Sequence, residues 1–518
     1  MKNKNTILFY VFLLLIIFVR FYLFYSINMA KLVNIIPDDA SYYFKIAENL
    51  ALGKGMTFDS FHQTNGVHPL WLFIITPFFL LEHIGLSGEV IFRILFFLQT
   101  ILQVSAGFLI YKAIRSFTNN NVPIIISALF LYLIIIKFTN GLETPLFFFM
   151  LSLLIWFIVS ITYLWHWFIA GIAAGLCILS RLDSIFIVPA LIIAAIADYK
   201  TKKYLTPRTV VYFVSGVIII VSPYLIYNQL VFGSIVPISG ILKSSTSYSL
   251  LSVSDNFKSL NKLYMLVFPL AVVYLSFYWS KLNRFIESSA SQNKYRFVVV
   301  LLCLTIIMHA IHTGFFMKWG LFDWHFALYP VTAIFILVEP VNYLIEKLPR
   351  LKYLITYSAL ILILGFICYR SASYKNFPKD WTEVVYNAAV WTRNHTSQDK
   401  IFAMKDAGHF AFFSGREVIN LDGLVNSFNY QDVLRDKKLN DYLSQNKVSY
   451  IVQHAFPGRN DIISGDYEMF SLPYISHKFG VISDPLILLK KDEIYRSGIY
   501  NHGGKPMVLL IWKYNHSY

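Results

Sequence analysis

Long apolar runs separated by short polar stretches occupy the first 369 residues of the chain. An apolar helix needs about 20 residues to cross a bilayer at right angles. Several runs are shorter, notably the two that flank residues 180–183, and these predict tilted, broken or paired half-helices. The runs lie near 7–27, 69–86, 91–111, 122–138, 145–163, 168–180, 185–197, 208–228, 263–280, 296–314, 326–345 and 352–369. The pattern therefore predicts an α-helical polytopic membrane protein with about 11–13 transmembrane helices.

The pattern changes near residue 370, where polar residues become common and apolar runs shrink to strand length. Helix-like spacing recurs at 380–394 and at 430–445. The strand-length runs lie at 400–404, 418–421, 449–452 and 507–512. We therefore expect two domains: a transmembrane catalytic domain over 1–369 and a soluble α/β domain over 370–518, large enough to form its own core.

Positive charge between the runs predicts the topology. The basic start, residues 1–4, and the basic stretches at 198–208, 281–296 and 346–352 favour the cytoplasmic side. The first run is interpreted as a retained anchor, and the C-terminal domain as extracytoplasmic. A cytoplasmic start and an outer tail require an odd number of crossings, so one of the twelve runs does not cross. The region 69–138 is suspected, because simple alternation places the basic segment 111–115 outside. The first outer loop then covers 31–68, in a multi-pass protein of the cell (inner or plasma) membrane.

Composition narrows the class of protein further. The chain of 518 residues is 57% hydrophobic and 14% charged, with a mean hydropathy of +0.57. These values exclude a soluble globular protein of this length. The formal charge of +15 is concentrated in the short basic stretches, so we expect no nucleic-acid partner. No phosphate-binding loop or dinucleotide fingerprint is present, which disfavours a cytosolic nucleotide-sugar donor.

Two adjacent carboxylates, Asp38 and Asp39, follow the first apolar run in a chain that otherwise contains few acids. An acidic pair at the outer surface suits proton abstraction, metal binding or sugar recognition. Pro37 followed by Asp is also a helix-start signal, so one carboxylate can cap a helix while the other is catalytic, in either order. The two charges repel unless a cation lies between them. No cofactor is certain, and the candidate is a divalent cation, Mg²⁺ or Mn²⁺, bound by this pair.

Other polar residues gather near the expected outer ends of the apolar runs. Glu143 lies between two apolar runs, with Arg181 as its expected partner, and the pair suits either substrate binding or structure. His68 is either a substrate ligand or an interfacial histidine. His309 and His312 have helical spacing for a metal, but two histidines alone are weak support for one. The candidate substrate-binding residues are Lys45, Lys54, Asn65, His68, Glu143, Arg181, Asp183, Lys243, Lys318, Trp319, Asp323 and His325.

Several motifs together resemble one superfamily. The chain contains Pro-Asp-Asp-Ala-Ser-Tyr-Tyr at 37–43, Thr-Asn-Gly-Val-His-Pro-Leu-Trp at 64–71, Asn-Gly-Leu-Glu-Thr at 140–144, Ser-Arg-Leu-Asp at 180–183 and Asn-Leu-Asp-Gly-Leu-Val-Asn at 420–426. It resembles the GT-C glycosyltransferases, which include protein O-mannosyltransferases, aminoarabinose transferases and arabinosyltransferases. The resemblance implies a polyprenyl-phosphate sugar donor and an extracytoplasmic glycan, lipid or protein acceptor. It also implies a first-loop aspartate as general base or metal ligand.

Three alternatives stay open at this point. An oligosaccharyltransferase has the same superfamily fold but uses a pyrophosphate donor, and it usually carries a Trp-Trp-Asp-like motif that this chain lacks. A lipid-linked saccharide flippase or transporter would place charges along a midplane path and show repeat symmetry. A membrane scaffold without catalytic activity is the third alternative.

Overall fold

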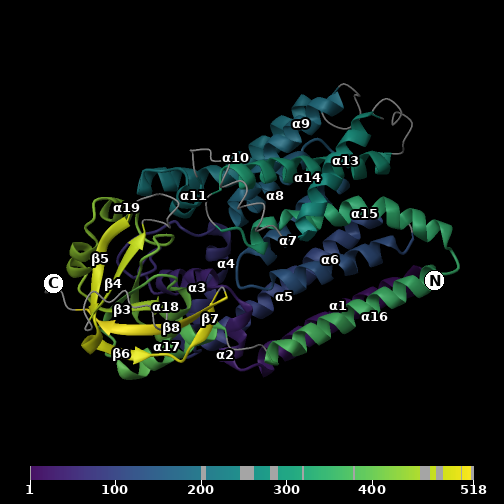
Figure 1. The fold of residues 1–518 in the computed structure, drawn as a ribbon. Coiled ribbons are helices and arrows are strands. Elements are labelled where there is room, and N and C mark those ends of the chain that lie inside the picture. The colour runs from purple at the N-terminus through teal and green to yellow at the C-terminus, as the bar shows by residue number, and fades with distance from the viewer. Residues whose placement is uncertain are drawn as a thin grey trace.

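The computed structural model describes residues 2–118, 120–199, 206–244, 262–280, 290–317, 320–376, 380–455, 467–473, 482–502 and 504–514. A bundle of long apolar helices forms most of the molecule, and a small sheet domain packs against one end of the bundle (Figure 1). Six helices are long and apolar enough to cross a membrane, and six shorter apolar helices accompany them in the described chain. The chain is therefore a multi-pass membrane protein with an α-helical membrane domain, as predicted.

Helices occupy all twelve of the predicted apolar runs. They are α1 (Lys2–Ser26), α4 (Pro69–Phe79), α5 (Gly88–Arg115), α6 (Val122–Phe138), α7 (Thr144–Ser160), α8 (His166–Ser180), α9 (Ile187–Tyr199), α10 (Pro207–Phe232), α13 (Lys262–Ser280), α14 (Ala290–Phe315), α15 (Leu328–Lys347) and α16 (Lys352–Ser373).

Helix α4 differs from the other apolar helices because both of its ends lie beside the C-terminal domain. Its first residue follows His68, which lines the central cavity described below. Its last residue, Phe79, packs edge-on against Phe412 of the C-terminal domain, with ring centroids 6.0 Å apart. Gly88, which begins α5, lies next to the same Phe412 ring. The run at 69–86 therefore has both of its ends on the side of the bundle that contacts the C-terminal domain.

The basic segment 111–115 and the start of α16 share the end of the bundle that holds the N-terminus. Asn5 donates a hydrogen bond to Asn121 at the start of α6, and Tyr357 near the start of α16 donates one to Asn5. Thr6 lies 3.3 Å from the hydroxyl of Tyr111, near the basic end of α5. The segment 111–115 thus lies at the same end of the bundle as the basic N-terminus.

The connections at one end of the bundle form a compact layer under the C-terminal domain (Figure 1). This layer contains α2 (Met29–Leu32), η1 (Val33–Ile35), α3 (Asp38–Ala51), η2 (Leu80–Ile84), η3 (Leu182–Phe186), α11 (Ile238–Lys243) and η5 (Asp323–Phe326). Helix α3 begins after Pro37, whose extended backbone precedes the acidic first turn. One hydrophobic cluster spans α3, α4, the start of α5 and helices of the C-terminal domain, so the layer and the domain share a core.

The C-terminal domain begins after η6 (Tyr374–Asn376) with α17 (Trp381–His395). In its main sheet, β1 pairs in parallel with β2 and β3, and β8 pairs antiparallel with β3, β6 and β7. The elements are β1 (Ile401–Met404), α18 (Gly408–Ser414), β2 (Glu417–Asn420), α19 (Phe428–Arg435), α20 (Leu439–Gln445), β3 (Val448–Ala455), β4 (Tyr467–Pro473), β5 (Ile482–Leu489), η8 (Lys490–Asp492), β6 (Glu493–Arg496), β7 (Tyr500–His502) and β8 (Lys505–Lys513).

All four predicted strands are present in the domain, within a residue or two at most ends. The helix expected over 430–445 is wrong as a single element. It is divided into α19 and α20 by a turn in which Lys437 has a φ of +57°. Strands β4 to β7 were not predicted, and β4 pairs only with β5 in the described chain, as a separate two-stranded sheet.

Candidate active site

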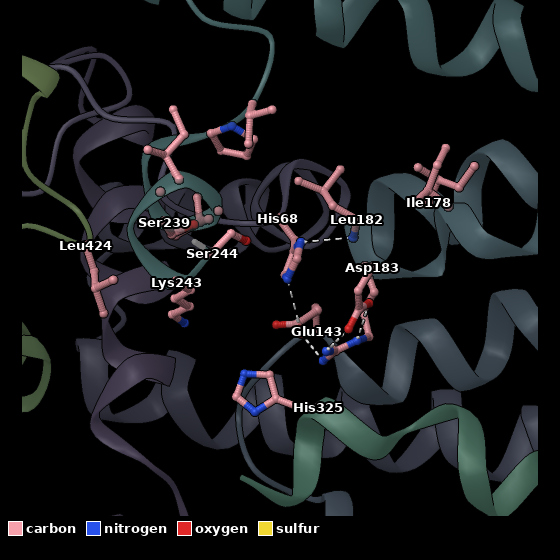
Figure 2. A pocket seen from close by; sticks show the side chains of 18 of the residues that line it. His68, Glu143, Ile178, Leu182, Asp183, Ser239, Lys243, Ser244, His325 and Leu424 are labelled. Atoms are coloured by element: carbon pink, nitrogen blue, oxygen red, sulfur yellow. Dashed lines mark hydrogen bonds and ion pairs between the residues drawn. The ribbon is translucent and has the colours of Figure 1, made fainter. Parts of the chain in front are cut away.

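A cavity of about 1140 Å³ lies where the bundle meets the C-terminal domain. Polar side chains from many separate segments reach it, and Figure 2 shows His68, Glu143, Lys243 and His325 directed toward a common space. Among the polar lining residues are Asp39, Tyr42, Tyr43, His68, Glu143, Arg181, Asp183, Lys243, His309, His312 and His325. The cavity therefore brings together residues that are hundreds of positions apart in the sequence.

A buried ion network forms one wall of the cavity. Arg181 donates from Nη1 to Glu143 Oε1 at 2.7 Å, which is the pair expected from the sequence. It also binds Asp183 through two nitrogens, at 3.2 and 2.8 Å. His309 Nε2 lies 3.4 Å from Asp183. The neighbouring carboxylates raise the pKa of Arg181 despite its burial, so the guanidinium stays charged.

Breaks in helical structure place this network at the cavity. Helix α8 ends at Ser180, and Arg181 has an extended backbone before η3 begins, which directs the guanidinium away from the helix. Gly141, at a φ of +73°, makes the turn that precedes Glu143. The side chain of Gln99 on α5 donates to Leu142 O at 2.6 Å and accepts from Gly141 N at 3.1 Å, and so holds this turn.

Tyr43 and His68, both from the segment 31–68, extend the network. The Tyr43 hydroxyl donates to Glu143 Oε2 at 2.9 Å and accepts from the His68 backbone N–H at 3.1 Å. The ring nitrogen Nδ1 of His68 accepts from the Leu182 N–H at 3.3 Å, so Nε2 carries the proton of the neutral ring. Burial, opposed by the charge of Glu143, lowers the pKa of His68. His68 is therefore a neutral donor at the cavity, and its Nε2 lies 3.7 Å from Glu143 Oε1 (Figure 2).

Asp39 and Lys243 are the two charged residues of the cavity that the network leaves without a close partner. No hydrogen bond or ion pair joins either side chain to another side chain in the part of the chain that the structure describes. Burial raises the pKa of Asp39, the positive charge of Lys243 lowers it, and the charges of Asp422 and Glu143 raise it. Asp39 is thus a carboxylate with free acceptor oxygens, and Lys243 is a cation with free donors.

The other member of the acidic pair, Asp38, faces away from the cavity. Its two carboxylate oxygens accept from the backbone N–H groups of Gly408 and His409, each at 2.7 Å. These groups begin α18, so Asp38 joins α3 to the C-terminal domain. Burial raises the pKa of Asp38, while the two N–H donors lower it. Asp38 is therefore the structural carboxylate of the pair, and Asp39 is the carboxylate that lines the cavity.

Four other candidate residues do not line the cavity. Lys45 pairs with Glu48 at 2.6 Å, and Lys54 lies 3.6 Å from Glu417 at the surface. Asp323 pairs with Lys137 at 3.2 Å, also near the surface. Asn65 is buried, and its side chain bonds Asn228 and the N–H of Ile238, which positions α11 rather than a ligand. Two further candidates, Lys318 and Trp319, lie outside the described residues.

The acidic pair is not arranged as a metal site. Both oxygens of Asp38 are directed at backbone N–H groups, which leaves Asp39 without the second carboxylate that a shared cation needs. Across the described residues, no group of three or more His, Cys, Asp or Glu side chains is placed to hold a metal ion. The residues at this position therefore do not fit the Mg²⁺ or Mn²⁺ ion considered from the sequence.

Among the lining residues that sequence reasoning missed are Tyr42, Tyr43 and Leu424. Tyr42 and Tyr43 follow Asp39 by three and four positions, which places them on the same face of α3. This spacing could have identified both tyrosines as neighbours of Asp39 from the sequence. Leu424 comes from the C-terminal domain, and its backbone carbonyl lies against Gly66. Nothing local in the sequence indicates that Leu424 reaches the cavity.

Comparisons with known proteins support the resemblance to the GT-C glycosyltransferases. The sequence profile of the family described as dolichyl-phosphate-mannose-protein mannosyltransferase matches residues 68–227. A second profile, of a domain of unknown function (DUF8728), matches residues 375–489. No curated protein sequence is significantly similar to the chain.

Solved structures match over most of the chain. ArnT from Cupriavidus metallidurans, bound to undecaprenyl phosphate, aligns with a TM-score of 0.56 at 9% identity, covering 99% of this chain and 98% of that one. The oligosaccharyltransferase of Archaeoglobus fulgidus in its apo form aligns with a TM-score of 0.54 at 12% identity, covering 87% of this chain and 69% of that one. The predicted resemblance to the GT-C superfamily and the fold class are confirmed, and the family match over residues 68–227 agrees with the predicted enzyme class.

Proposed function

We propose that this protein transfers a sugar from a polyprenyl-phosphate donor to an acceptor outside the cytoplasm, with Asp39 as the general base. The observation that carries the proposal is the isolation of Asp39. The other acids of the cavity, Glu143 and Asp183, are both bound by Arg181, and Asp38 is bound by amides. A base must accept a proton from a substrate, so it needs an oxygen that the protein does not already use.

The departing phosphate requires hydrogen-bond donors and positive charge at the cavity. Lys243 supplies a positive charge at the cavity that forms no ion pair with any residue the structure describes. His68 supplies a neutral Nε2–H, and so does His325, because its Nδ1 accepts from the Phe322 N–H at 3.0 Å. Donors already oriented toward a developing negative charge stabilise the transition state more than the ground state. These three side chains are our candidates for phosphate binding, with Arg181 behind them as a fixed charge.

An apolar side of the cavity supports a lipid-linked donor. Ile235, Val236 and Ile241 line it, yet they are about half exposed at 52%, 49% and 44%. Apolar side chains that are exposed on a membrane protein at the edge of a cavity suit contact with lipid chains. Each buried CH₂ of a prenyl chain contributes about 0.8 kcal/mol of binding free energy. We propose that the donor enters through this side, with its phosphate near Lys243.

The reaction follows from these positions. The acceptor hydroxyl donates its proton to Asp39, and its oxygen forms a bond to the anomeric carbon of the donor sugar. The bond between that carbon and the phosphate oxygen breaks, and polyprenyl phosphate leaves with the electron pair. Lys243 and the two histidine N–H groups stabilise its added charge. The bound proton then leaves Asp39 for water.

We further propose that the cavity and the C-terminal domain lie outside the cytoplasm, in the inner or plasma membrane. The N-terminus and the basic stretches at 346–352 and 111–115 share the opposite end of the bundle. Positive charge flanking membrane helices favours the cytoplasmic side.

The experiment uses purified protein in proteoliposomes with radiolabelled polyprenyl-phosphate sugars, and it measures release of polyprenyl phosphate with water or a membrane extract as acceptor. We expect turnover that Asp39→Asn abolishes. The matched control is Asp432→Asn, which changes an acid paired with Arg435 on the surface of α19. Equal turnover of a soluble nucleotide sugar without any lipid carrier would exclude the proposal.

A second candidate is transfer from a lipid-pyrophosphate oligosaccharide. The match to the Archaeoglobus fulgidus oligosaccharyltransferase, of which one structure holds an inhibitory peptide and a dolichol phosphate, favours it. The same assay separates the two, because this candidate requires turnover of a polyprenyl-pyrophosphate donor and an asparagine-containing peptide as acceptor.

A further inference from the structure

The loop at residues 420–426 of the C-terminal domain follows strand β2 and reaches the cavity, where Leu424 and Val425 line it. Asn420 accepts from the Gly423 N–H at 2.9 Å, and Asn426 donates to Asn420 O at 2.9 Å. Gly423 has a φ of +85°, which a side chain would disfavour. These internal bonds make the loop a fixed part of the wall.

Asp422 is the centre of this loop and is 6% exposed. Its Oδ2 accepts from the Tyr42 hydroxyl at 2.9 Å, from Asn420 Nδ2 at 3.0 Å and from the Asp406 N–H at 3.2 Å, while Oδ1 accepts from the Leu424 N–H at 2.9 Å. Four donors stabilise its negative charge. No cation forms an ion pair with it among the described residues, so the charge is not cancelled locally.

Helix α3 is held by this domain along one face. Asp38 binds the start of α18, Ser41 lies 2.7 Å from His409 Nδ1, and Tyr42 binds Asp422. These positions are spaced by three and four residues, so they form one stripe of the helix. The ring of Tyr42 also packs edge-on against Phe58, with centroids 5.4 Å apart. Asp39 lies beside this stripe and lines the cavity together with Tyr42.

We infer that Asp422 is a positioning residue for Asp39: through Tyr42 it sets the orientation of α3, and its charge acts on the Asp39 carboxylate. The inference rests on the proposed function, because it assumes that Asp39 is the base. It also assigns the C-terminal domain a part in the reaction, since the domain supplies a group that controls a residue of the membrane domain.

The charge of Asp422 has a defined direction of effect. A nearby negative charge disfavours ionisation of a carboxyl group. Burial is the largest cause that raises the pKa of Asp39, the positive charge of Lys243 lowers this pKa, and the negative charge of Asp422 raises it. Asp422→Asn should therefore lower the pH at which Asp39 loses its proton. The charged groups that act on Asp39 are Lys243 on α11, Asp422 on the loop, Glu143 before α7, Asp406 after β1 and Asp38 on its own helix.

The test measures the protonation of Asp39 directly, so that it does not depend on turnover. A hydrophobic carbodiimide reacts with protonated carboxyl groups, and mass spectrometry of the Asp39 peptide gives the pH of half-maximal modification. In Asp422→Asn we expect this pH to fall by about one unit. The control Asp432→Asn should leave it unchanged. Equal values in the wild type and in folded Asp422→Asn would overturn the inference.

Tyr42→Phe provides a second arm that keeps the charge and the ring but removes the hydrogen bond. We expect the half-modification pH of Asp39 to stay near the wild-type value. We expect kcat for a polyprenyl-phosphate donor to fall by about tenfold, with the KM of the donor little changed, because the base loses its orientation. Full kcat in Tyr42→Phe would refute the positioning role. If the wild-type protein is inactive with every lipid-linked donor, the proposed function is refuted. The carbodiimide measurement then decides this inference by itself.

Discussion

Gly66→Ala should separate the first outer loop from the C-terminal domain. A Cβ added at Gly66 would lie 1.9 Å from the carbonyl oxygen of Leu424 and 3.3 Å from Cγ2 of Ile238. A carbon and a carbonyl oxygen stay at least about 3.3 Å apart, so the loop would have to move by about 1.4 Å. Hydrogen bonds within 420–426 resist that movement. We expect a loss of about 1–3 kcal/mol, the usual range for overpacking.

Two readouts distinguish a local separation from general unfolding. Cys177 and Cys303 are buried in the membrane domain, so a thiol-reactive dye reports the unfolding of that domain during heating. Proteolytic release of the C-terminal domain reports its separation. In Gly66→Ala we expect release at a lower temperature while the thiol transition changes less. Turnover should also fall, since Leu424 lines the cavity.

The matched control is Gly498→Ala in the same domain, where a Cβ would meet nothing within 4 Å. Its release temperature should stay close to the wild-type value, because surface substitutions of this kind change stability by only about 0.5 kcal/mol. A Gly66→Ala protein that behaves like Gly498→Ala in both readouts would show that the loop and the C-terminal domain are not in contact as described.

Three further predictions follow from the charged groups. Asp39→Asn should reduce turnover about 10²–10⁴-fold. Burial raises the folded pKa of Asp39, so its stabilising contribution is complete below the unfolded pKa and is lost as pH rises through the folded pKa. Asp39→Asn should therefore raise the unfolding temperature at neutral pH. An unchanged unfolding temperature from pH 4 to 8 would contradict this. Arg181→Met should destabilise the protein by about 3–5 kcal/mol, because two buried carboxylates lose their partner, and thermal unfolding checks it. In a cysteine-free background, an impermeant thiol reagent should label Lys438→Cys but not Arg350→Cys in intact cells; the reverse would invert the topology.

The hydrophobic pattern was sufficient to predict the helices, because a bilayer requires long apolar segments whatever their packing. It did not determine which segments cross. Helix α4 has 11 residues and contains Pro77, and its direction depends on the contact of Phe79 with Phe412, a residue more than 330 positions later. A contact at that separation leaves no local trace in the pattern.

The candidate site divides in the same way. The sequence alone indicated Glu143 and Arg181 as partners, since isolated charges between apolar runs need each other. It also indicated the acidic pair. It did not decide between Asp38 and Asp39, because adjacent residues on a helix point about 100° apart and the choice depends on what covers each face.

Only the tertiary structure made that choice. Docking of α18 on one face of α3 uses both oxygens of Asp38, and it leaves Asp39 toward the cavity opposite Lys243. The sequence by itself determined the class of protein, the membrane helices and the residue types available for chemistry, because these depend on composition and local periodicity. The tertiary structure decided which of those residues share the cavity, because that depends on packing between segments remote in the chain.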